Sequence, residues 1–317
     1  MAIDTLELIG RTAPGAGMEL ATPWVESPLF AAELASRELT EAERQMAVRY
    51  HEDGYVVLLG LADDAFCDRI REETEPLFRP PFEPGRSATR AQDAWKVSPA
   101  ARALATHPRV MAALSMLYGR RPLPFQTLNF PVGTQQRAHS DSIHFSCLPA
   151  RYMCGVWVAL EDTELDNGPL FYYPGSQRLP EFDYQDLALP DDQSGEMYGR
   201  RYELYEDRIE ALMAAAGFER RRLVVRKGDA LLWSSNLVHG GSPILRPGAS
   251  RWSQVTHYFF EGCIYYTPLM SNRVTGELAL RNHLVDIATG TPLVHSYSGS
   301  KVVMAEAPGG RFRIAIV

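Results

Sequence analysis

The chain has 317 residues, of which 45% are hydrophobic and 22% are charged, a composition typical of a globular protein with a sizeable core. Its net charge of -7 offers no long-range attraction to the phosphates of nucleic acids or to anionic lipid heads. We therefore expect neither nucleic acid nor a membrane surface as a partner.

Cysteine usage and the N-terminal sequence indicate a compartment. The four cysteines, Cys67, Cys147, Cys154 and Cys263, show no CxxC spacing, and residues 1–15 lack a basic region followed by an apolar run. No apolar run approaches the roughly 20 residues of a membrane-spanning helix. The sequence predicts a reduced, cytoplasmic protein without a transmembrane segment, and it leaves the oligomeric state undetermined.

The first regular elements follow an aperiodic stretch of about forty residues rich in Ala, Pro and Gly. In "LTEAERQMAVRYHEDGYVVLLG", Thr40 and Glu43 form a capping-box pattern, which predicts a helix that ends near residues 53–54. A strand is predicted over residues 55–59. The segment "ADDAFCDRIREETEPLF" predicts a second helix, because its apolar residues share one face and a pair of prolines at 80–81 ends the pattern.

From residue 123 onward, short β-type runs are separated by turn residues. Such runs in succession, without a helix between each pair, favour an antiparallel sandwich or barrel over a parallel doubly wound sheet. Residues 183–222 interrupt them with a polar loop and a charged helix, "LYEDRIEALMAAAGFERRR", and this insertion fits either a lid over a site or a surface decoration. The β-type runs are "PFQTLNF", "YMCGVWVAL", "GPLFYYPGS", "RLVVRKGD", "ALLWSS" and "RWSQVTHYFF".

The stretch "AHSDSIHFSC" brings two histidines and an aspartate together. In an extended strand His139 and Asp141 project to the same face, because side chains alternate. A third ligand must come from elsewhere, and His239 in "NLVHGGSP" follows a predicted strand end. Two histidines and one carboxylate leave open positions on a metal, which suits a non-haem Fe(II) enzyme that activates O2, with zinc as the competing ion.

Two further groups bear on this site. His144 is the rival of His139 as metal ligand, but only His139 has the HxD spacing, so we expect His144 to be a substrate contact or a pocket histidine. In "RWSQVTHYFF", Arg251, Ser253 and His257 share one strand face. An Arg and a Ser two residues apart can bind a carboxylate through charge-assisted hydrogen bonds, although an Arg in a surface ion pair is the alternative.

In combination, these motifs resemble the phytanoyl-CoA dioxygenase-like branch of the Fe(II)/2-oxoglutarate oxygenases, which includes ectoine hydroxylase. The family pattern of HxD, a distal His and a following Arg maps onto His139, Asp141, His239 and Arg251. The segment "VWVALEDTELDNGPLFYYPGSQR" is similar to a family stretch that ends in PGSH, with Gln177 in place of the usual His.

The resemblance covers roughly residues 45–260 and implies a mainly β fold with flanking helices, built on a double-stranded β-helix, that is, a jelly-roll or cupin-like barrel. We expect a single oxygenase domain over residues 1–317. Its parts are an N-terminal extension (1–44), flanking helices and first strand (45–122), a β-helix core (123–260) that carries the 183–222 insertion, and a C-terminal extension (261–317).

The resemblance also implies the cofactors. Fe(II) is expected at the catalytic residues His139, Asp141 and His239, with 2-oxoglutarate as cosubstrate and O2 as oxidant. The expected contacts to 2-oxoglutarate are Arg251, Ser253, Trp157 and Asn129.

Some of these contacts have alternatives in the sequence. Trp157 would serve equally well for packing in a buried strand. Arg246 is the other arginine near the distal histidine and could bind the cosubstrate instead of Arg251. Ser242 is a candidate to replace a serine that the family carries two residues after that histidine.

The implied reaction is hydroxylation, or a related oxidation, of an unactivated carbon in a small organic substrate of secondary metabolism, coupled to conversion of 2-oxoglutarate to succinate and CO2. Halogenases of this superfamily carry Gly or Ala at the carboxylate position, so Asp141 favours hydroxylation. The alternatives are a barrel that binds metal or ligand without catalysis and a non-redox metal enzyme. The negative net charge disfavours a CoA thioester as substrate.

Overall fold

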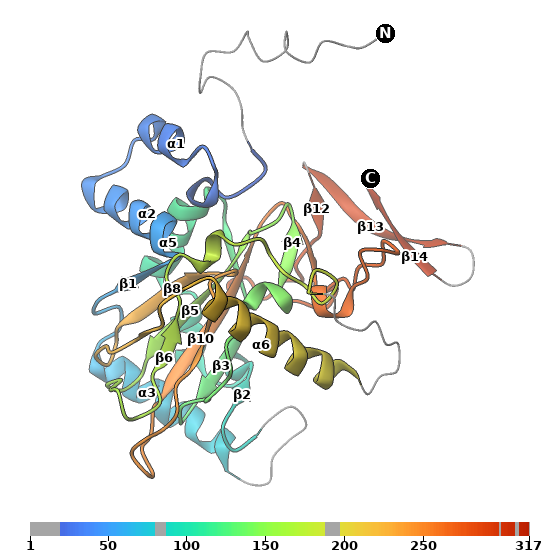
Figure 1. Cartoon of the computed structure of the whole chain (residues 1–317). Coiled ribbons are helices and arrows are strands. Elements are labelled where there is room, and N and C mark those ends of the chain that lie inside the picture. Colours follow the sequence, from blue (N-terminus) through green and yellow to red (C-terminus); the bar gives the residue numbers. More distant parts are fainter. Residues whose placement is uncertain (1–19, 80–86, 188–196, 298, 308–310, 317) are drawn as a thin grey trace, which may run out of the picture.

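A computed structural model of the chain describes residues 20–79, 87–187, 197–297, 299–307 and 311–316. Its centre is a six-stranded antiparallel sheet with the order β1-β8-β5-β10-β3-β2 (Figure 1). Successive side chains of the long strands point to opposite faces of the sheet, and both faces are buried. This is expected for a central antiparallel sheet that is covered on both sides. In chain order these strands are β1 (Tyr55–Leu58), β2 (Ala91–Gln92), β3 (Pro122–Phe130), β5 (Met153–Ala159), β8 (Ala230–Ser234) and β10 (Ser253–Phe260).

Three smaller sheets complete the described β-structure, with the orders β7-β6-β9, β11-β4 and β12-β13-β14. The last of these extends to one side, away from the six-stranded sheet (Figure 1). Their strands are β4 (Ser146–Leu148), β6 (Leu170–Tyr172), β7 (Arg221–Arg222), β9 (His239–Gly241), β11 (Ile264–Tyr266), β12 (Ser296–Tyr297), β13 (Ser300–Ala307) and β14 (Arg311–Ile316).

The pairing confirms a mainly β fold of antiparallel strands with flanking helices. The described strands fall into separate hydrogen-bonded sheets and do not close into one continuous barrel. One expected strand, "RLVVRKGD" (222–229), is mostly irregular: within it Arg222 pairs with β6, as part of β7, and Val225 forms an isolated bridge to Thr163.

One helix, α2 (Glu41–Asp53), begins at the capping box that the sequence predicts. Thr40 and Glu43 form the reciprocal capping box, and the helix ends at Gly54, whose φ of 79° is left-handed. Two helices that the sequence reading did not identify start with proline in the first turn, behind Ser98 and His107. The helices are α1 (Phe30–Ser36), α2 (Glu41–Asp53), α3 (Asp64–Thr74), α4 (Pro99–Ala105), α5 (Pro108–Tyr118) and α6 (Met197–Ala215).

Short 3-10 turns join several of these elements. The second predicted helix ends at Thr74 and continues as such a turn, while the proline pair at 80–81 lies outside the described residues. The turns are η1 (Trp24–Glu26), η2 (Glu75–Phe78), η3 (Ala94–Lys96), η4 (Asp141–Ile143), η5 (Ser176–Arg178) and η6 (Pro268–Met270).

The two faces of the six-stranded sheet bury different neighbours. On one face Val156, Leu232 and Phe260 pack against the helices in the main hydrophobic core. On the other face Trp157 and Trp233 pack with residues of the β6 strand. This second face is where the chemistry-bearing residues gather.

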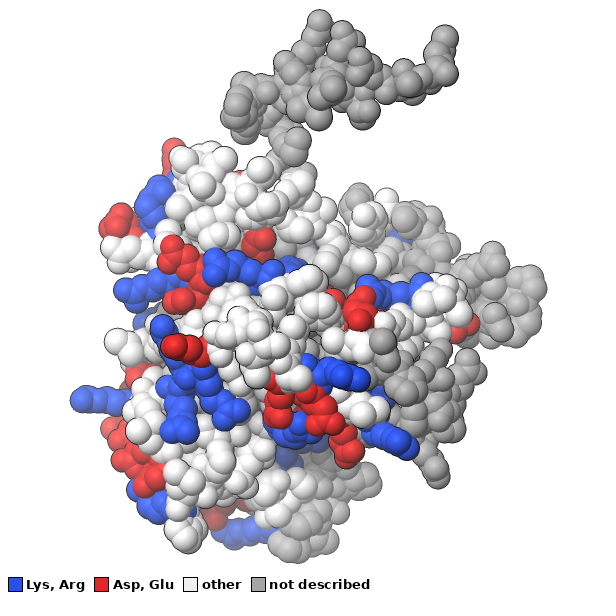
Figure 2. All heavy atoms as spheres, viewed as in Figure 1, with Lys and Arg blue, Asp and Glu red and all other residues white. Residues whose placement is uncertain are grey.

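The visible surface carries side chains of both charges. Figure 2 shows basic and acidic side chains interspersed over the visible face, so neither sign dominates there. Among the helices that the structure describes, each is too short or too polar to cross a membrane.

Candidate active site

The two histidines of the sequence motif meet through their backbones. The His139 N–H donates to the His239 carbonyl and the His239 N–H donates to the His139 carbonyl, both at 2.9 Å. His239 opens strand β9, and this strand lies close to the loop before His139. A Cβ on Gly240 would lie only 2.6 Å from the Gln136 carbonyl oxygen, so the glycine permits the approach.

The aspartate joins them by a turn and not by strand alternation. Asp141 begins the 3-10 turn η4, and its backbone carbonyl accepts from the N–H groups of His144 and Phe145. Its Oδ1 lies 3.9 Å from Nε2 of His139 and 3.9 Å from Nε2 of His239. The ligand atoms of these three buried residues all lie within 4.8 Å of one another. Such a set can hold one metal ion.

Backbone hydrogen bonds orient the imidazoles. His139 Nδ1 lies 2.9 Å from the Arg137 carbonyl, and His239 Nδ1 lies 2.9 Å from the Leu237 carbonyl. Because a carbonyl only accepts, each Nδ1 carries the proton and each Nε2 offers its lone pair to the space beside Asp141. This is the tautomer that a metal ligand requires.

Trp233 holds the carboxylate, a role that the sequence reading did not assign. Its indole N–H donates to Asp141 Oδ2 at 2.8 Å, which leaves Oδ1 facing the two histidines. The ring fits because Gly155 lies opposite Trp233 in strand β5, where a Cβ would approach the indole to 2.3 Å. Burial would raise the pKa of Asp141, but His239, His257 and the Trp233 N–H hold it below its ordinary value.

Two more histidines lie beside this group. His257 places Nε2 3.7 Å from Asp141 Oδ2, while its Nδ1 lies 3.0 Å from Gln126 Oε1. His144 lines the same pocket but lies outside the three-residue group of converging ligand atoms. The geometry thus favours His139 over His144 as the metal-facing histidine.

These buried histidines predict an acid-sensitive metal-free protein. Burial lowers the pKa of His144 and His257 to about 4 and that of His139 to about 3. Below a pH of about 6.5, the pKa of histidine in the unfolded chain, these side chains are protonated when unfolded but stay neutral when folded. The free energy of unfolding therefore falls as the pH drops toward 4. At pH 5 one histidine with a folded-state pKa of about 4 lowers the free energy of unfolding by roughly 2 kcal/mol. The thermal midpoint of metal-free protein should fall between pH 7 and pH 5, and less so in His257→Gln; a flat midpoint would contradict this.

A cavity of about 380 Å³ adjoins the three residues. Its walls come from the second face of the six-stranded sheet, from β6 and β9, and from the C-terminal extension. The extension contributes Thr267, Met270 and Arg281, which the sequence reading did not single out. No local pattern marks them, since they are far from the motifs in the chain.

Arg251 is a buried cation in this wall. Its side chain is only 1% exposed, and Nε and Nη1 have no hydrogen-bond partner within the described part of the chain. The guanidinium carbon lies 5.3 Å from the ring centre of Trp157, whose indole N–H is also buried without a partner among the described residues. Burial lowers the pKa of Arg251 to about 10, with Glu161 opposing, so the side chain stays protonated at neutral pH.

The other expected cosubstrate contacts are placed differently. Ser253 is buried with an unpartnered hydroxyl in the described structure, but it does not line the cavity. Asn129 is not brought to the cavity either: its amide donates to Gln254 Oε1 at 3.1 Å, while Leu128 and Phe130 on the opposite strand face line the wall. Strand alternation therefore turns Asn129 toward the helices.

The two alternative contacts named from the sequence, Arg246 and Ser242, do not line the cavity. Arg246 is a surface residue that pairs with Glu164 at 2.9 Å, so it is not the buried arginine. Ser242 is buried but does not line the cavity.

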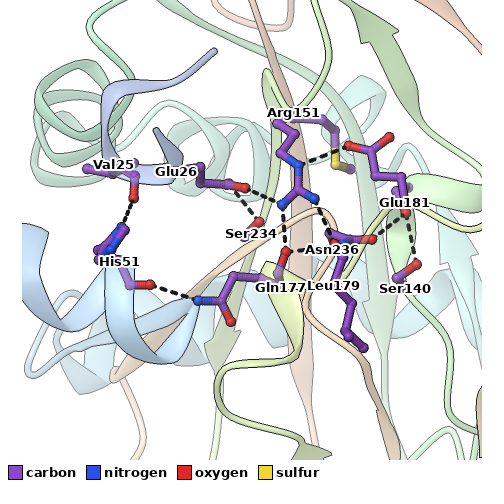
Figure 3. A network of polar contacts seen from close by, with 12 residues as sticks. Val25, Glu26, His51, Ser140, Arg151, Gln177, Leu179, Glu181, Ser234 and Asn236 are labelled. Carbon is purple, nitrogen blue, oxygen red and sulfur yellow. Dashed lines mark hydrogen bonds and ion pairs between the residues drawn. The ribbon is translucent and has the colours of Figure 1, made fainter. Parts of the chain in front are cut away.

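Gln177, which replaces a family histidine, belongs to a scaffold next to the site (Figure 3). Its side-chain amide donates to the carbonyls of His51 and Glu52 at the end of α2, at 2.9 and 3.3 Å. Its own backbone carbonyl accepts from Arg151 and from Asn236. The substitution thus ties η5 to α2 and makes no contact with the cavity.

Asn236 extends this scaffold to the aspartate turn. Its Oδ1 accepts from the Ser142 hydroxyl at 3.2 Å, within η4. Arg151, at the centre of Figure 3, pairs with Glu26 at 2.9 Å and lies 3.7 Å from Glu181. The turn that carries Asp141 is therefore fixed to the N-terminal segment and to the 176–181 segment at once.

The insertion at 183–222 packs beside the histidine segment. Within α6, Tyr205, Ile209 and Met213 are at most 2% exposed and join a hydrophobic cluster with Ala138 and Val238. The residues preceding His139 also hold the helix, because Arg137 pairs with Glu210 at 2.8 Å. Of the described residues of the insertion, none lines the cavity, and residues 188–196 lie outside the described ranges.

We expect α6 to behave as a fixed element. Its buried face predicts slow amide hydrogen exchange over residues 203–213 in the ligand-free protein, with little change when Fe(II) and 2-oxoglutarate are added. Exchange followed by mass spectrometry measures this. Fast exchange that slows strongly on ligand addition would instead support the lid that the length of the insertion suggests.

Several solved structures share this fold. The epimerase SnoN from nogalamycin biosynthesis aligns with a TM-score of 0.56 and 24% identity over 80% of this chain and 95% of its own. The carbocyclase SnoK from the same biosynthesis aligns with a TM-score of 0.56 and 18% identity, over 81% of this chain and 94% of its own. The structure of EctD from S. alaskensis with 2-oxoglutarate and 5-hydroxyectoine aligns with a TM-score of 0.54 and 20% identity. The alignment covers 72% of this chain and 80% of the EctD chain.

Sequence comparison supplies the family. No curated protein sequence matches the chain. The family model for phytanoyl-CoA dioxygenase (PhyH) matches residues 50–251, which is more than half of the chain and includes the histidines, Asp141 and Arg251. The chain therefore belongs to the phytanoyl-CoA dioxygenase family of Fe(II)- and 2-oxoglutarate-dependent oxygenases.

Proposed function

We propose that this oxygenase hydroxylates, or otherwise oxidises, an unactivated carbon of a small organic substrate in secondary metabolism. His139, Asp141 and His239 hold the iron, and Arg251 binds the far carboxylate of 2-oxoglutarate. Fold similarity to the oxygenases supports a double-stranded β-helix in which the six-stranded sheet and the β7-β6-β9 sheet form the two walls.

Buried Arg251 is the observation that carries the proposal. An unpaired buried cation is costly, and this one lines a cavity with two of its nitrogens unpartnered in the described structure. A carboxylate satisfies both nitrogens at once, because the planar guanidinium offers two parallel donors. The unpartnered Trp157 N–H lies beside it and offers a further donor. The donor set thus fits the cosubstrate.

The metal donors fit Fe(II) equally well. Two neutral imidazoles and one carboxylate leave positions for 2-oxoglutarate and O2. When bound, iron and 2-oxoglutarate supply the oxidising chemistry, which the protein itself does not carry. The chain orients the ligands through the Nδ1–carbonyl bonds and the Trp233 N–H. Apolar side chains such as Leu128, Phe130 and Val255 form part of the cavity wall and limit the access of water to the reacting carbon.

The volume of the cavity limits the size of the substrate. A cavity of about 380 Å³ lies at the small end of the range for ligand pockets, and 2-oxoglutarate takes part of it. A small substrate fits the rest. We propose that residues 1–317 form one oxygenase domain, because described residues of both extensions, such as Trp24 and Leu293, belong to the main hydrophobic core. All four cysteines are free and buried, which suits a reducing cytoplasm.

An isotope experiment tests this function. Protein with Fe(II) and 2-oxoglutarate is incubated with a pool of small metabolites under 16O2 and, separately, under 18O2. The expected result is a product that gains one oxygen atom from O2, formed together with an equal amount of succinate. If iron and 2-oxoglutarate bind but no compound changes and no succinate forms, a non-catalytic metal-binding barrel becomes the better description.

A further inference from the structure

One pair of polar side chains in the cavity wall takes no part in the proposed binding of iron or 2-oxoglutarate. His257 of β10 lies directly opposite Gln126 of β3, and both side chains line the cavity. The register of the two strands shifts immediately afterwards, between His257 and Tyr258. Such irregularities are common next to active sites, where they redirect a side chain. The pair therefore lies where a ligand in the cavity can reach it.

The hydrogen bond within the pair determines which atom donates and which accepts. His257 Nδ1 lies 3.0 Å from Gln126 Oε1. Because an amide oxygen only accepts, Nδ1 carries the proton, and Nε2 of the neutral ring offers a lone pair. The amide nitrogen of Gln126 has no hydrogen-bond partner among the described residues, so it still offers its N–H groups. The pair thus presents one acceptor and one donor.

The acceptor of this pair lies on the metal side of the cavity. His257 Nε2 is 3.7 Å from Asp141 Oδ2, which accepts from the Trp233 N–H. That distance is longer than a hydrogen bond, and two acceptor atoms cannot bond to each other. The lone pair of Nε2 is therefore available to a ligand that lies beside the metal-binding residues.

Packing holds the imidazole of His257 in this orientation. Its ring centre lies 6.1 Å from that of Phe125 and 4.8 Å from that of Phe145, and the residue is buried. A side chain positioned in this way loses little freedom when it binds a ligand. A buried polar atom that a ligand leaves unpaired is costly, so such a site discriminates against ligands without the matching group.

From this arrangement we propose that the substrate carries a neutral hydroxyl or carboxamide group, which donates to His257 Nε2 and accepts from Gln126 Nε2. A carboxylate cannot donate and an ammonium group cannot accept, so neither satisfies both atoms. This inference rests on the proposed function, because it takes iron and 2-oxoglutarate to occupy the part of the cavity next to Arg251. It makes His257 a residue that selects the substrate.

Matched neutral probes test the inference without turnover. Protein with Fe(II) and saturating 2-oxoglutarate under argon is titrated calorimetrically with cyclohexanol, cyclohexanecarboxamide and methoxycyclohexane, an ether that accepts but cannot donate. We expect the alcohol or the carboxamide to bind at least tenfold more tightly than the ether, and the better of the two identifies the group. His257→Phe keeps an aromatic ring but should remove this preference. Gln126→Leu should weaken the binding of all three probes.

His283→Phe is the matched control, since His283 is exposed and does not line the cavity. It should leave the preference unchanged. Equal binding of the alcohol, the carboxamide and the ether by the unmodified protein would overturn the inference, as would an unchanged preference in a folded His257→Phe variant. The absorbance of the Fe(II)–2-oxoglutarate complex, recorded on the same samples, reports separately on the proposed function.

Discussion

Replacing His139, Asp141 or His239 with alanine is expected to abolish stoichiometric Fe(II) binding and all 2-oxoglutarate turnover. The three ligand atoms lie within 4.8 Å of one another, so each variant leaves only two donors. The loss should exceed the 10- to 100-fold weakening that follows removal of a hydrogen-bonding partner of a ligand. Iron content after anaerobic dialysis measures the effect, with thermal unfolding as a check on the fold.

Two variants serve as comparisons for these replacements. His144→Ala should retain iron, because His144 lies outside the converging group. Trp233→Phe keeps all three ligands but removes the 2.8 Å bond to Asp141, so its iron affinity should fall roughly 10- to 100-fold. If His144→Ala lost iron while His139→Ala retained it, the ligand assignment would be exchanged.

Arg251→Ala should weaken 2-oxoglutarate binding at least 30-fold while Fe(II) binding persists. Truncating one partner of a buried charge pair costs about 2 to 5 kcal/mol, and each 1.4 kcal/mol is about tenfold in affinity. The 1% exposure of Arg251 means that water cannot replace the lost donors easily. Titration of the Fe(II)–2-oxoglutarate absorbance under argon gives the dissociation constant.

The conservative change separates charge from geometry. Arg251→Lys keeps the positive charge but loses the planar pair of donors, so its affinity for 2-oxoglutarate should lie between those of the parent and Arg251→Ala. Arg246→Ala is the control, because Arg246 is half exposed and paired with Glu164. A loss of affinity in Arg246→Ala, together with a normal titration in Arg251→Ala, would transfer the cosubstrate to Arg246.

The parts of the site that a short motif or a local pattern specifies were predictable from the sequence. The HxD spacing and the distal His identified three residues whose ligand atoms do converge, and the capping box of Thr40 located α2. Alternation along one extended strand, which was expected to bring His139 and Asp141 together, does not explain their position. His139 and Asp141 share a site because a 3-10 turn follows a β-bridge, and not because one strand continues through both.

Residues that depend on pairing between distant segments escaped prediction. Trp233 reaches Asp141 only because Gly155 lies opposite it in another strand, a register that no local pattern reveals. Arg281 joins the cavity from a C-terminal segment without recognisable periodicity. Asn129 illustrates the converse case, since a polar residue in a strand was expected at the cosubstrate but lies on the face that meets the helices.

The most direct test of the central claim is the conversion of 2-oxoglutarate to succinate by the purified protein. Each metal and gas condition is measured against the Asp141→Ala variant as background. Succinate is expected above that background only when Fe(II) and O2 are both present, because the two-histidine, one-carboxylate set leaves metal positions for the cosubstrate and for oxygen. Equal succinate formation with zinc under argon, or none above the Asp141→Ala background with Fe(II) and O2, would contradict the account.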